Sequence, residues 1–389
     1  MRASWGQLGN TNTNDAWYPF YQTMPVGSNY GWLVNGERPN YATNPGIVSS
    51  KKTWETVETW DVGLDWSFFN NRLSGSFDYF VRYTYDMIGP APELSSLLGT
   101  SVPKINNSDM KSYGFELEVN WRDRIGEVSY GAKFVLSDDQ QKILRYPNDS
   151  YDVGSYYKGE HLNDIWGLTT IGIAKSQEEM DAHLAKVDQS SVGTNWGVGD
   201  IMYADLDGDG KISNGTNKLG DTGDYRIIGN STPRFKYGIT LDAAWKGFDF
   251  SMLLQGVGKH KVYYNNQAFR FVTVMGQSLN KDITDHAWTP ENPYNSKYPR
   301  LRNNANSKNN IASDALVFNA SYLRCKNIQL GYTLPSHISE KFFVENLKIY
   351  TSIDNLFTLT DFPGLDPEIA AGVGYPQLRQ YSVGINVTF

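Results

Sequence analysis

The amino-acid sequence predicts an all-β protein, an antiparallel up-and-down transmembrane β-barrel of which about ten strands are present. Three observations lead to this fold class. Apolar and polar residues alternate along ten segments, the connections between segments alternate between short and long, and aromatic residues gather at the segment ends. Spanning strands of about 9–11 residues, with short turns on one side and longer loops on the other, are typical of membrane barrels.

The final segment shows the alternation most clearly, because Tyr381, Val383, Ile385, Val387 and Phe389 are separated by polar residues or glycine. Successive side chains of a strand point to opposite faces, so this segment has one apolar and one polar face. Charged residues fall almost wholly on the polar register, as a lipid-facing surface requires. The pattern recurs in segments 1–9, 59–69, 73–85, 113–122, 127–138, 234–245, 248–259, 322–334 and 346–356.

The connections follow the rule of an up-and-down barrel, in which successive turns emerge on opposite sides of the membrane. Asn70-Asn71, 123–126 and Lys246-Gly247 are short, and 335–345 is intermediate. With Phe389 at the periplasmic rim, all of these fall on the periplasmic side. The long connections then become extracellular loops, and these are 10–57, 87–111, 139–233, 260–321 and 357–378.

Aromatic residues at the two ends of the segments predict interfacial belts. A large soluble all-β protein with aromatic residues at its strand ends by chance is the alternative. One set lies beside the short turns and comprises Trp66, Phe68, Trp121, Trp245, Phe248 and Phe389, and the other comprises Tyr85, Tyr113, Phe235 and Tyr381.

Composition narrows the possible function classes. The single cysteine, Cys325, excludes an internal disulfide and argues against a cysteine-based metal site. A net charge of −7 and a pI near 5.3 argue against nucleic acid as a partner. No run approaches the ~20 apolar residues of a spanning helix. The N-terminus has no signal-peptide pattern, so we expect residues 1–389 to be the C-terminal portion of a longer barrel protein.

Two segments of the 139–233 loop have local signatures. Residues 176–187 predict a short helix, with Ser176 as its N-cap and Glu179 three residues later. The run Asp205-x-Asp207-x-Asp209 has the spacing of a calcium loop, and the Lys211 carbonyl would be the next ligand. Position 12 of such a loop would be Thr216 in place of the usual glutamate. A bound Ca²⁺ and an acidic turn closed by its own Asx hydrogen bonds both remain open.

No nucleophile elbow, phosphate loop or histidine pair at metal-ligand spacing is apparent, so the chain is not expected to be an enzyme or to require a cofactor. Aromatic faces stack on sugar rings, and aromatic residues of the long loops would suit a glycan. They would equally suit packing within the loops or docking of a protein lid. The candidate ligand residues are Tyr156, Tyr157, Trp166, Trp196 and Trp288.

Sequence motifs occur in order along essentially the whole chain. They begin at the first strand and continue through the long central loop to the last two hairpins. The motifs are Arg2-Ala3-Ser4-Trp5-Gly6-Gln7-Leu8-Gly9-Asn10, Trp54-Glu55-Thr56, Asp61-Val62-Gly63-Leu64-Asp65, Gly199-Asp200-Ile201, Asp205-Leu206-Asp207-Gly208-Asp209-Gly210, Ile228-Gly229-Asn230, Pro233-Arg234-Phe235, Tyr322-Leu323-Arg324, Asp354-Asn355-Leu356-Phe357 and Gly364-Leu365-Asp366-Pro367-Glu368.

These motifs resemble the SusC/RagA family of TonB-dependent transporters. The resemblance implies an importer in the outer membrane of a Gram-negative, Bacteroidetes-like bacterium. It implies a bulky nutrient, an oligosaccharide or a peptide, with a SusD-like surface lipoprotein over the loops and TonB acting through a plug outside this sequence. It also implies that the terminal Phe389 is read by the barrel-assembly machinery.

A sheet open at both edges would leave unpaired backbone groups in lipid, so we expect no transport by this chain alone. Two other classes remain as alternatives. A stand-alone adhesin or porin would need a signal peptide, and a membrane-embedded hydrolase would need a catalytic cluster on one inward register.

Overall fold

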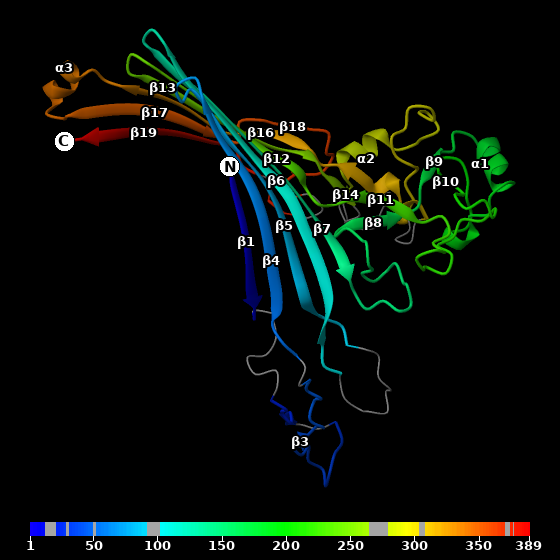
Figure 1. The fold of residues 1–389 in the computed structure, drawn as a ribbon. Coiled ribbons are helices and arrows are strands. Elements are labelled where there is room, and N and C mark those ends of the chain that lie inside the picture. The colour runs from blue at the N-terminus through cyan, green and yellow to red at the C-terminus, as the bar shows by residue number, and fades with distance from the viewer. Residues whose placement is uncertain are drawn as a thin grey trace.

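The computed structural model describes residues 1–11, 21–28, 31–49, 52–91, 102–263, 279–302, 308–369, 374–375 and 377–389. Its main feature is one antiparallel sheet, called the wall here, in which ten strands pair in chain order (Figure 1). This order confirms the predicted up-and-down fold class. The wall strands are β1 (Arg2–Asn10), β4 (Glu55–Phe68), β5 (Leu73–Gly89), β6 (Ile105–Ile125), β7 (Val128–Arg145), β12 (Arg234–Trp245), β13 (Phe248–Lys259), β16 (Tyr322–Thr333), β17 (Asn346–Asp354) and β19 (Gln380–Thr388).

The wall does not close on itself within the described residues. β1 pairs only with β4, and β19 pairs only with β17. The short strand β18 (Thr358–Thr360) adds to β16 beside the end of β17. The described sheet is therefore part of a barrel, as the sequence predicts.

The pairing register places the predicted apolar sets on one face of the wall. Directly paired residues share a face, and Trp60 lies opposite Trp5 and Val81. Leu117 lies opposite Phe77 on β5 and Leu136 on β7. This face is called the outer face. Its side chains stay uncovered by the chain, as Trp60 (51% exposed) and Ile385 (65%) on β19 show, and this uncovered apolar surface is what a lipid-facing barrel wall requires.

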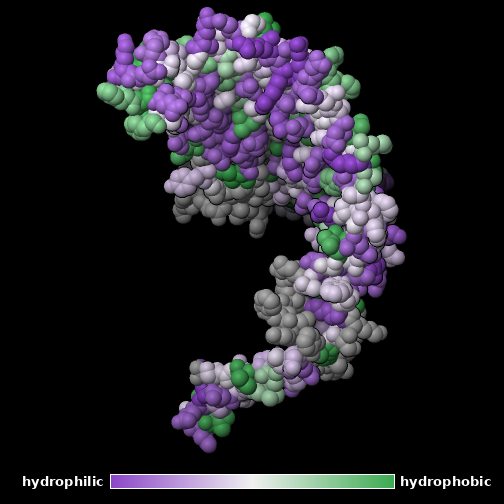
Figure 2. All heavy atoms as spheres, turned by 60° about the vertical axis from the view of Figure 1, so that its left-hand side comes forward, coloured by the Kyte–Doolittle hydropathy of each residue, from purple (hydrophilic) through white to green (hydrophobic). Residues whose placement is uncertain are grey.

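The other register forms the inner face, and it carries ion pairs. The Lys133 ammonium lies 2.9 Å from the Glu118 carboxylate, and Lys348 lies 2.8 Å from Asp249. Arg2 of β1 reaches Asp78 of β5 at 2.5 Å. Polar residues also cover much of the described surface seen in Figure 2. Because half of every strand faces water, the mean hydropathy of −0.48 is compatible with a membrane barrel.

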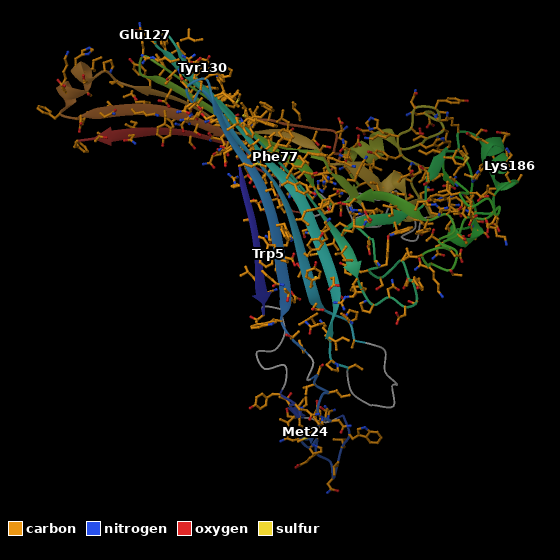
Figure 3. The ribbon with its side chains drawn as sticks, in the orientation of Figure 1. Trp5, Met24, Phe77, Glu127, Tyr130 and Lys186 are labelled. Atoms are coloured by element: carbon orange, nitrogen blue, oxygen red, sulfur yellow. The ribbon has the colours of Figure 1, made fainter. Side chains whose placement is uncertain are left out.

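Short and long connections lie at opposite ends of the strands, called the turn rim and the loop rim. At the turn rim, Lys246 and Gly247 have φ values of 46° and 84°. Such left-handed values at both central residues form the tight turn that suits a twisted hairpin, and glycine adopts them without strain. Figure 3 shows Glu127 at this rim and Met24 beyond the opposite end of the sheet. The predicted alternation is thereby confirmed.

Several wall strands extend further toward the loop rim than the apolar alternation predicts. β4 begins at Glu55 instead of 59, β6 begins at Ile105 instead of 113, and β7 continues to Arg145 instead of 138. Backbone pairing does not require apolar side chains, so the ladder continues where neither face shows the apolar alternation. The 139–233 connection consequently begins at 146.

The connections contain short elements of their own. The helices of the described residues are too short and too polar to span a bilayer. The helices are α1 (Gln177–Leu184), α2 (Lys281–His286), α3 (Ser336–Ser339) and the 3-10 turns η2 (Ser190–Val192), η3 (Lys308–Asn310), η4 (Asp314–Leu316) and η5 (Glu340–Phe342); the strands are β2 (Val26–Gly27), β3 (Tyr41–Ala42), β8 (Asp164–Gly167), β9 (Thr170–Ile173), β10 (Ile201–Tyr203), β11 (Arg226–Asn230), β14 (Lys261–Tyr263) and β15 (Val317–Asn319).

Candidate functional site

Two long connections fold together at the loop rim into a unit with its own core, called the loop domain (residues 146–233, 279–302 and 308–321). Figure 1 shows it beside the ends of β12, β13 and β16. Short strand pairs β8–β11 and β9–β10 organise its first segment. Its buried core also takes in Val262 and Phe362, and the remaining members are Leu168, Ile201, Tyr203, Ile212, Ile283, Ala287, Tyr298, Leu316 and Ala320.

The helix predicted over 176–187 is present as α1, which is shorter and covers Gln177–Leu184. Ser176 Oγ accepts a hydrogen bond from the Glu179 amide at 3.2 Å, as a capping residue should. Met180 is the buried residue that fixes the helix against Ala174 and Met202.

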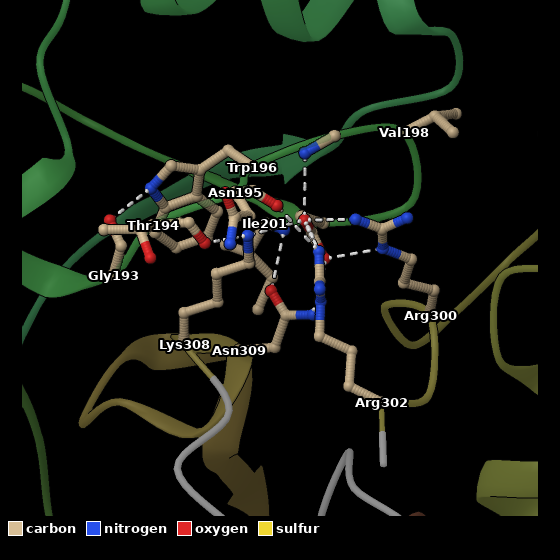
Figure 4. A network of polar contacts seen from close by, with 12 residues as sticks. Gly193, Thr194, Asn195, Trp196, Val198, Ile201, Arg300, Arg302, Lys308 and Asn309 are labelled. Atoms are coloured by element: carbon tan, nitrogen blue, oxygen red, sulfur yellow. Dashed lines mark hydrogen bonds and ion pairs between the residues drawn. The ribbon is translucent and has the colours of Figure 1, made fainter. Parts of the chain in front are cut away.

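A fully buried carboxylate, Asp200, joins the two segments of the loop domain (Figure 4). Arg300 donates from Nε to Oδ1 at 2.9 Å and from Nη2 to Oδ2 at 2.8 Å. Arg302 binds both oxygens in the same way, at 3.0 and 2.5 Å. The Lys308 ammonium lies 3.2 Å from Oδ2, and the Asn309 amide donates at 3.1 Å. This set is called the Asp200 hub.

The charges of the hub are unequal, with three cations around one carboxylate. Burial alone would raise the pKa of Asp200, but hydrogen bonds from Arg300 and Arg302 hold it well below the ordinary value. Burial lowers the pKa of Lys308 to about 8, although Asp200 acts in the opposite direction. The Lys308 ammonium also lies 4.3 Å from the centroid of the Trp196 ring. The hub is therefore an electrostatic clamp between segments about 100 residues apart.

The five aromatic candidates occupy different surroundings in the loop domain. Tyr157 (8% exposed) meets Trp166 edge to face at 6.4 Å, whereas Tyr156 (48% exposed) packs on Tyr146. Trp196 lies under Lys308 and donates its indole hydrogen to the Gly193 carbonyl at 2.9 Å. The Trp288 ring is close enough to Gly199 that a Cβ there would approach it to 2.6 Å. The structure thus gathers Tyr157 and Trp166, and ligand contact by these five remains a prediction.

The Asp-rich loop brings three carboxylates together, as its spacing predicts. One oxygen each of Asp205, Asp207 and Asp209 lies within 4.8 Å of the others. Asp205 also accepts hydrogen bonds from the amides of Gly208 at 2.7 Å and Gly210 at 2.9 Å. The donor set fits a hard cation, and the amide contacts fit an Asx-closed turn. A cation here remains a prediction.

A second ion network holds the last long connection against the wall. Arg324 of β16, 2% exposed, donates to Asp366 at 2.7 Å and lies 3.1 Å from Glu368. The Tyr322 hydroxyl donates to Glu368 at 3.1 Å. Pro367 and Glu368 thereby cover one side of a cavity of about 530 Å³.

This cavity, called the wall cavity, lies mainly against inner-face positions of β7, β12 and β13. Val135 is paired with Gly238, and Gly238 with Gln255, so these three share the inner face. The cavity offers polar groups of both kinds and apolar surface between them. Its lining is completed by Ser137, Pro233, Lys236, Tyr237, Leu253, Gly256, Val257, His260, Tyr322, Pro367 and Glu368.

Sequence reasoning missed the Asp200 hub and the Arg324 network as functional features. Asp200, Arg324, Asp366 and Glu368 stood out only as members of sequence motifs. Their partners lie far along the chain, and no local spacing connects Asp200 with Arg300. For Asp200 the available signal was a single charged residue in the otherwise uncharged segment 189–204.

Comparison with known proteins agrees with this architecture. Residues 1–356 match the family model described as "TonB dependent receptor-like, beta-barrel". The whole chain aligns with 39% of TonB-dependent receptor P3 of Formosa agariphila at 28% identity, and with 37% of TonB-dependent receptor SusC of Bacteroides thetaiotaomicron at 24% identity.

Solved structures share the fold. The chain superposes over its full length on 40% of a chain in the structure of the RagAB peptide transporter, with a TM-score of 0.72 and 23% identity. It therefore spans about 40% of the length of the relatives that it matches. The chain belongs to the TonB-dependent receptor β-barrel family and is of the SusC/RagA type.

Proposed function

We propose that this chain supplies the wall and surface loops of a TonB-dependent outer-membrane importer of a bulky nutrient of the oligosaccharide class. The family consists of outer-membrane receptors of Gram-negative bacteria, and the wall with its lipid-facing outer face agrees with that location. The observation that carries the substrate class is the wall cavity. It lies on the water-facing side of the wall, beside the loop rim where a nutrient would enter.

The chemistry of the wall cavity suits a sugar. Gln255 offers an amide, Ser137 a hydroxyl and Glu368 a carboxylate, while Tyr322 and the prolines offer flat apolar surface. Sugar rings need both kinds of contact, because hydroxyl groups require hydrogen-bond partners and the ring faces are apolar. A peptide is the second candidate, since a structure that shares this fold is that of a peptide importer.

Partners of the whole protein follow from the same proposal. A SusD-like lipoprotein would close over the loop domain, where Ile171 and Tyr294 are 62% and 75% exposed. TonB would act through a plug domain supplied by another part of the protein. Transport would then be energised gating with no covalent step, and Phe389, 90% exposed after β19, would serve as the assembly signal.

The proposal is tested with the full-length transporter and its lipoprotein in their native host. Cells that import labelled oligosaccharides but not peptides of similar mass would support it, and the reverse result would replace oligosaccharide with peptide. Gln255→Ala should reduce oligosaccharide uptake several-fold. Gln329→Ala is the matched control, because Gln329 lies on the inner face of β16 outside the wall cavity. Equal uptake by both variants would contradict a role for the cavity.

A further inference from the structure

Two lysines lie directly opposite each other on the outer face of the wall. Lys111 of β6 pairs with Lys142 of β7, in the same unbroken register that pairs Leu117 with Leu136. Like charges in directly opposite positions destabilise an antiparallel pair. None of the carboxylates in the described part of the chain forms an ion pair with either ammonium. A bound anion would supply the acidic partner that both lysines lack on this face.

The acidic groups of the same face nearby have other partners. Glu58 of β4 lies beyond Tyr83 and accepts a hydrogen bond from the Trp60 indole at 2.6 Å. Asp138 of β7 is buried and binds the guanidinium of Arg234 through both oxygens. Asp109, two residues before Lys111 on β6, is held by Arg145 at 2.6 Å, and Arg145 also reaches Asp86 at 2.7 Å.

Tyrosine rings surround Lys111. Its ammonium lies 5.6 Å from the centroid of Tyr83 and 5.1 Å from that of Tyr113. Tyr85 stacks on Tyr83 at 5.6 Å with the ring planes 4° apart. Cation–π contact holds an ammonium in place without removing its charge. The lysine is thus positioned among rings of the kind that occupy the membrane interface.

The height of this group on the wall matches the headgroup level. Lys111 lies ten residues along β6 from Trp121, which belongs to the aromatic belt at the turn rim. At about 3.3 Å per residue and a tilt of about 40°, ten residues rise about 25 Å. That rise equals the height of the apolar band of a membrane barrel, about 25 Å. Lys111 and Lys142 therefore lie at the far edge of the hydrocarbon.

We propose that Lys111 and Lys142, within the Tyr83–Tyr85–Tyr113 group, bind the phosphate of a lipid headgroup in the leaflet at the loop rim. The phosphate would neutralise the two facing ammonium groups, and its acyl chains would run down the apolar outer face. The inference depends on the wall facing lipid and is independent of the nutrient transported.

The test uses the purified full-length transporter in detergent and lipid A with one phosphate. Native mass spectrometry gives the bound fraction as lipid is added. A juxtamembrane lysine contributes about 1 kcal/mol to binding of an anionic headgroup. Each lysine removed should therefore weaken binding of the lipid about fivefold, so Lys111→Gln combined with Lys142→Gln should weaken it about thirtyfold. The variant with Lys111→Arg and Lys142→Arg keeps both positive charges, so it should bind the lipid as tightly as the unaltered protein does.

Two controls make the proposal refutable. Lys133→Gln removes the same charge from the inner face of β7 and should leave lipid binding unchanged. Lipid A freed of its phosphate should bind the unaltered protein and the double glutamine variant equally weakly. Unchanged binding of the phosphorylated lipid by a correctly folded double glutamine variant, shown by its heat-modifiable gel mobility, would overturn the proposal. Equal weakening by Lys133→Gln would do the same.

Discussion

The wall and the loop domain differ in what covers their large apolar side chains. Large apolar side chains of the wall, such as Leu64 (49% exposed) and Ile385, are uncovered by the protein, while polar ones pair across the inner face. In the loop domain Leu168, Tyr203 and Ile283 are fully buried, and the Asp200 hub lies beside them. The wall relies on lipid as the solvent of its apolar face, and the loop domain builds an interior of its own.

This difference indicates which kind of substitution should destabilise each region. Hydrogen bonds between strands that follow one another in the order of the wall hold it together, and the alternation within each strand marks where that strand lies. The loop domain depends on a few contacts between distant segments, with Asp200 and Lys308 as examples. Substitutions should therefore affect one region without the other, and each of the following predictions tests that separation.

The largest effect is expected for Asp200→Ala. Removal of the carboxylate leaves Arg300, Arg302 and Lys308 facing one another without compensation. Breaking a buried ion pair from one side costs about 3–5 kcal/mol. Limited proteolysis should cut the loop domain far faster in this variant, while heat-modifiable mobility of the barrel is retained.

The control is Asp285→Ala, which removes a carboxylate of α2 whose partner Lys281 is solvent-exposed. Exposed pairs contribute at most about 1 kcal/mol, so cleavage should change little. If Asp200→Ala prevented barrel assembly, or left the loop domain fully protected, the two regions would not be separable in the way described.

A charge on the outer face should have the next largest effect, and this time on the wall. Leu117 lies midway along β6 on the outer face, and Glu116 is its inner-face neighbour. An arginine facing lipid near the bilayer middle costs about 2–4 kcal/mol. Leu117→Arg should therefore lower the yield of folded barrel in a urea titration in lipid vesicles, and Glu116→Arg should not. Equal loss in both would show that residue 117 does not face lipid.

The wall could be predicted from the sequence because its period is local. Ten strands, their order and the alternation of turn lengths all follow from spacing of two residues and from turn residues such as Lys246-Gly247. The strand ends near Ile105 and Arg145 were missed, since polar residues on both faces give no alternation there. In that region only the backbone ladder defines the strand.

The loop domain could be predicted only in part. Helix α1 and the gathering of Asp205, Asp207 and Asp209 follow from local motifs, and both are seen. The Asp200 hub joins groups about 100 residues apart, and the Arg324 network joins Arg324 to Asp366 across the last connection. No periodicity encodes such contacts, because they depend on how two loops fold against each other.

Calcium provides a test confined to one loop. If Asp205, Asp207 and Asp209 bind the cation, saturation at 100 times Kd should stabilise the loop domain by about 2.7 kcal/mol. Slower proteolytic cleavage near residues 205–211 on Ca²⁺ titration would show this. Asp207→Asn with Asp209→Asn should abolish the protection. Unchanged cleavage of the unaltered protein at every Ca²⁺ concentration would leave the Asx-closed turn as the explanation.

The smallest predicted effect is a pH dependence that belongs to the loop domain alone. In an opened loop domain Lys308 keeps its proton up to its ordinary pKa of 10.5, whereas burial lowers the pKa to about 8 in the folded state. Between these values the folded state binds fewer protons, so rising pH favours it. From pH 7.5 to 9 the gain should be about 1 kcal/mol.

Tyr203 and Tyr298 leave this range undisturbed, because burial raises the pKa of both above the ordinary value and they stay protonated. Urea titrations of the loop domain, followed by tryptophan fluorescence, should therefore show a midpoint that increases from pH 7.5 to 9. Lys308→Met should remove this increase of the midpoint with pH, even if the substitution also changes the stability of the loop domain. A midpoint that stays constant over this range would mean that Lys308 remains fully charged beside Asp200, and that the hub clamps the two segments with all three cations.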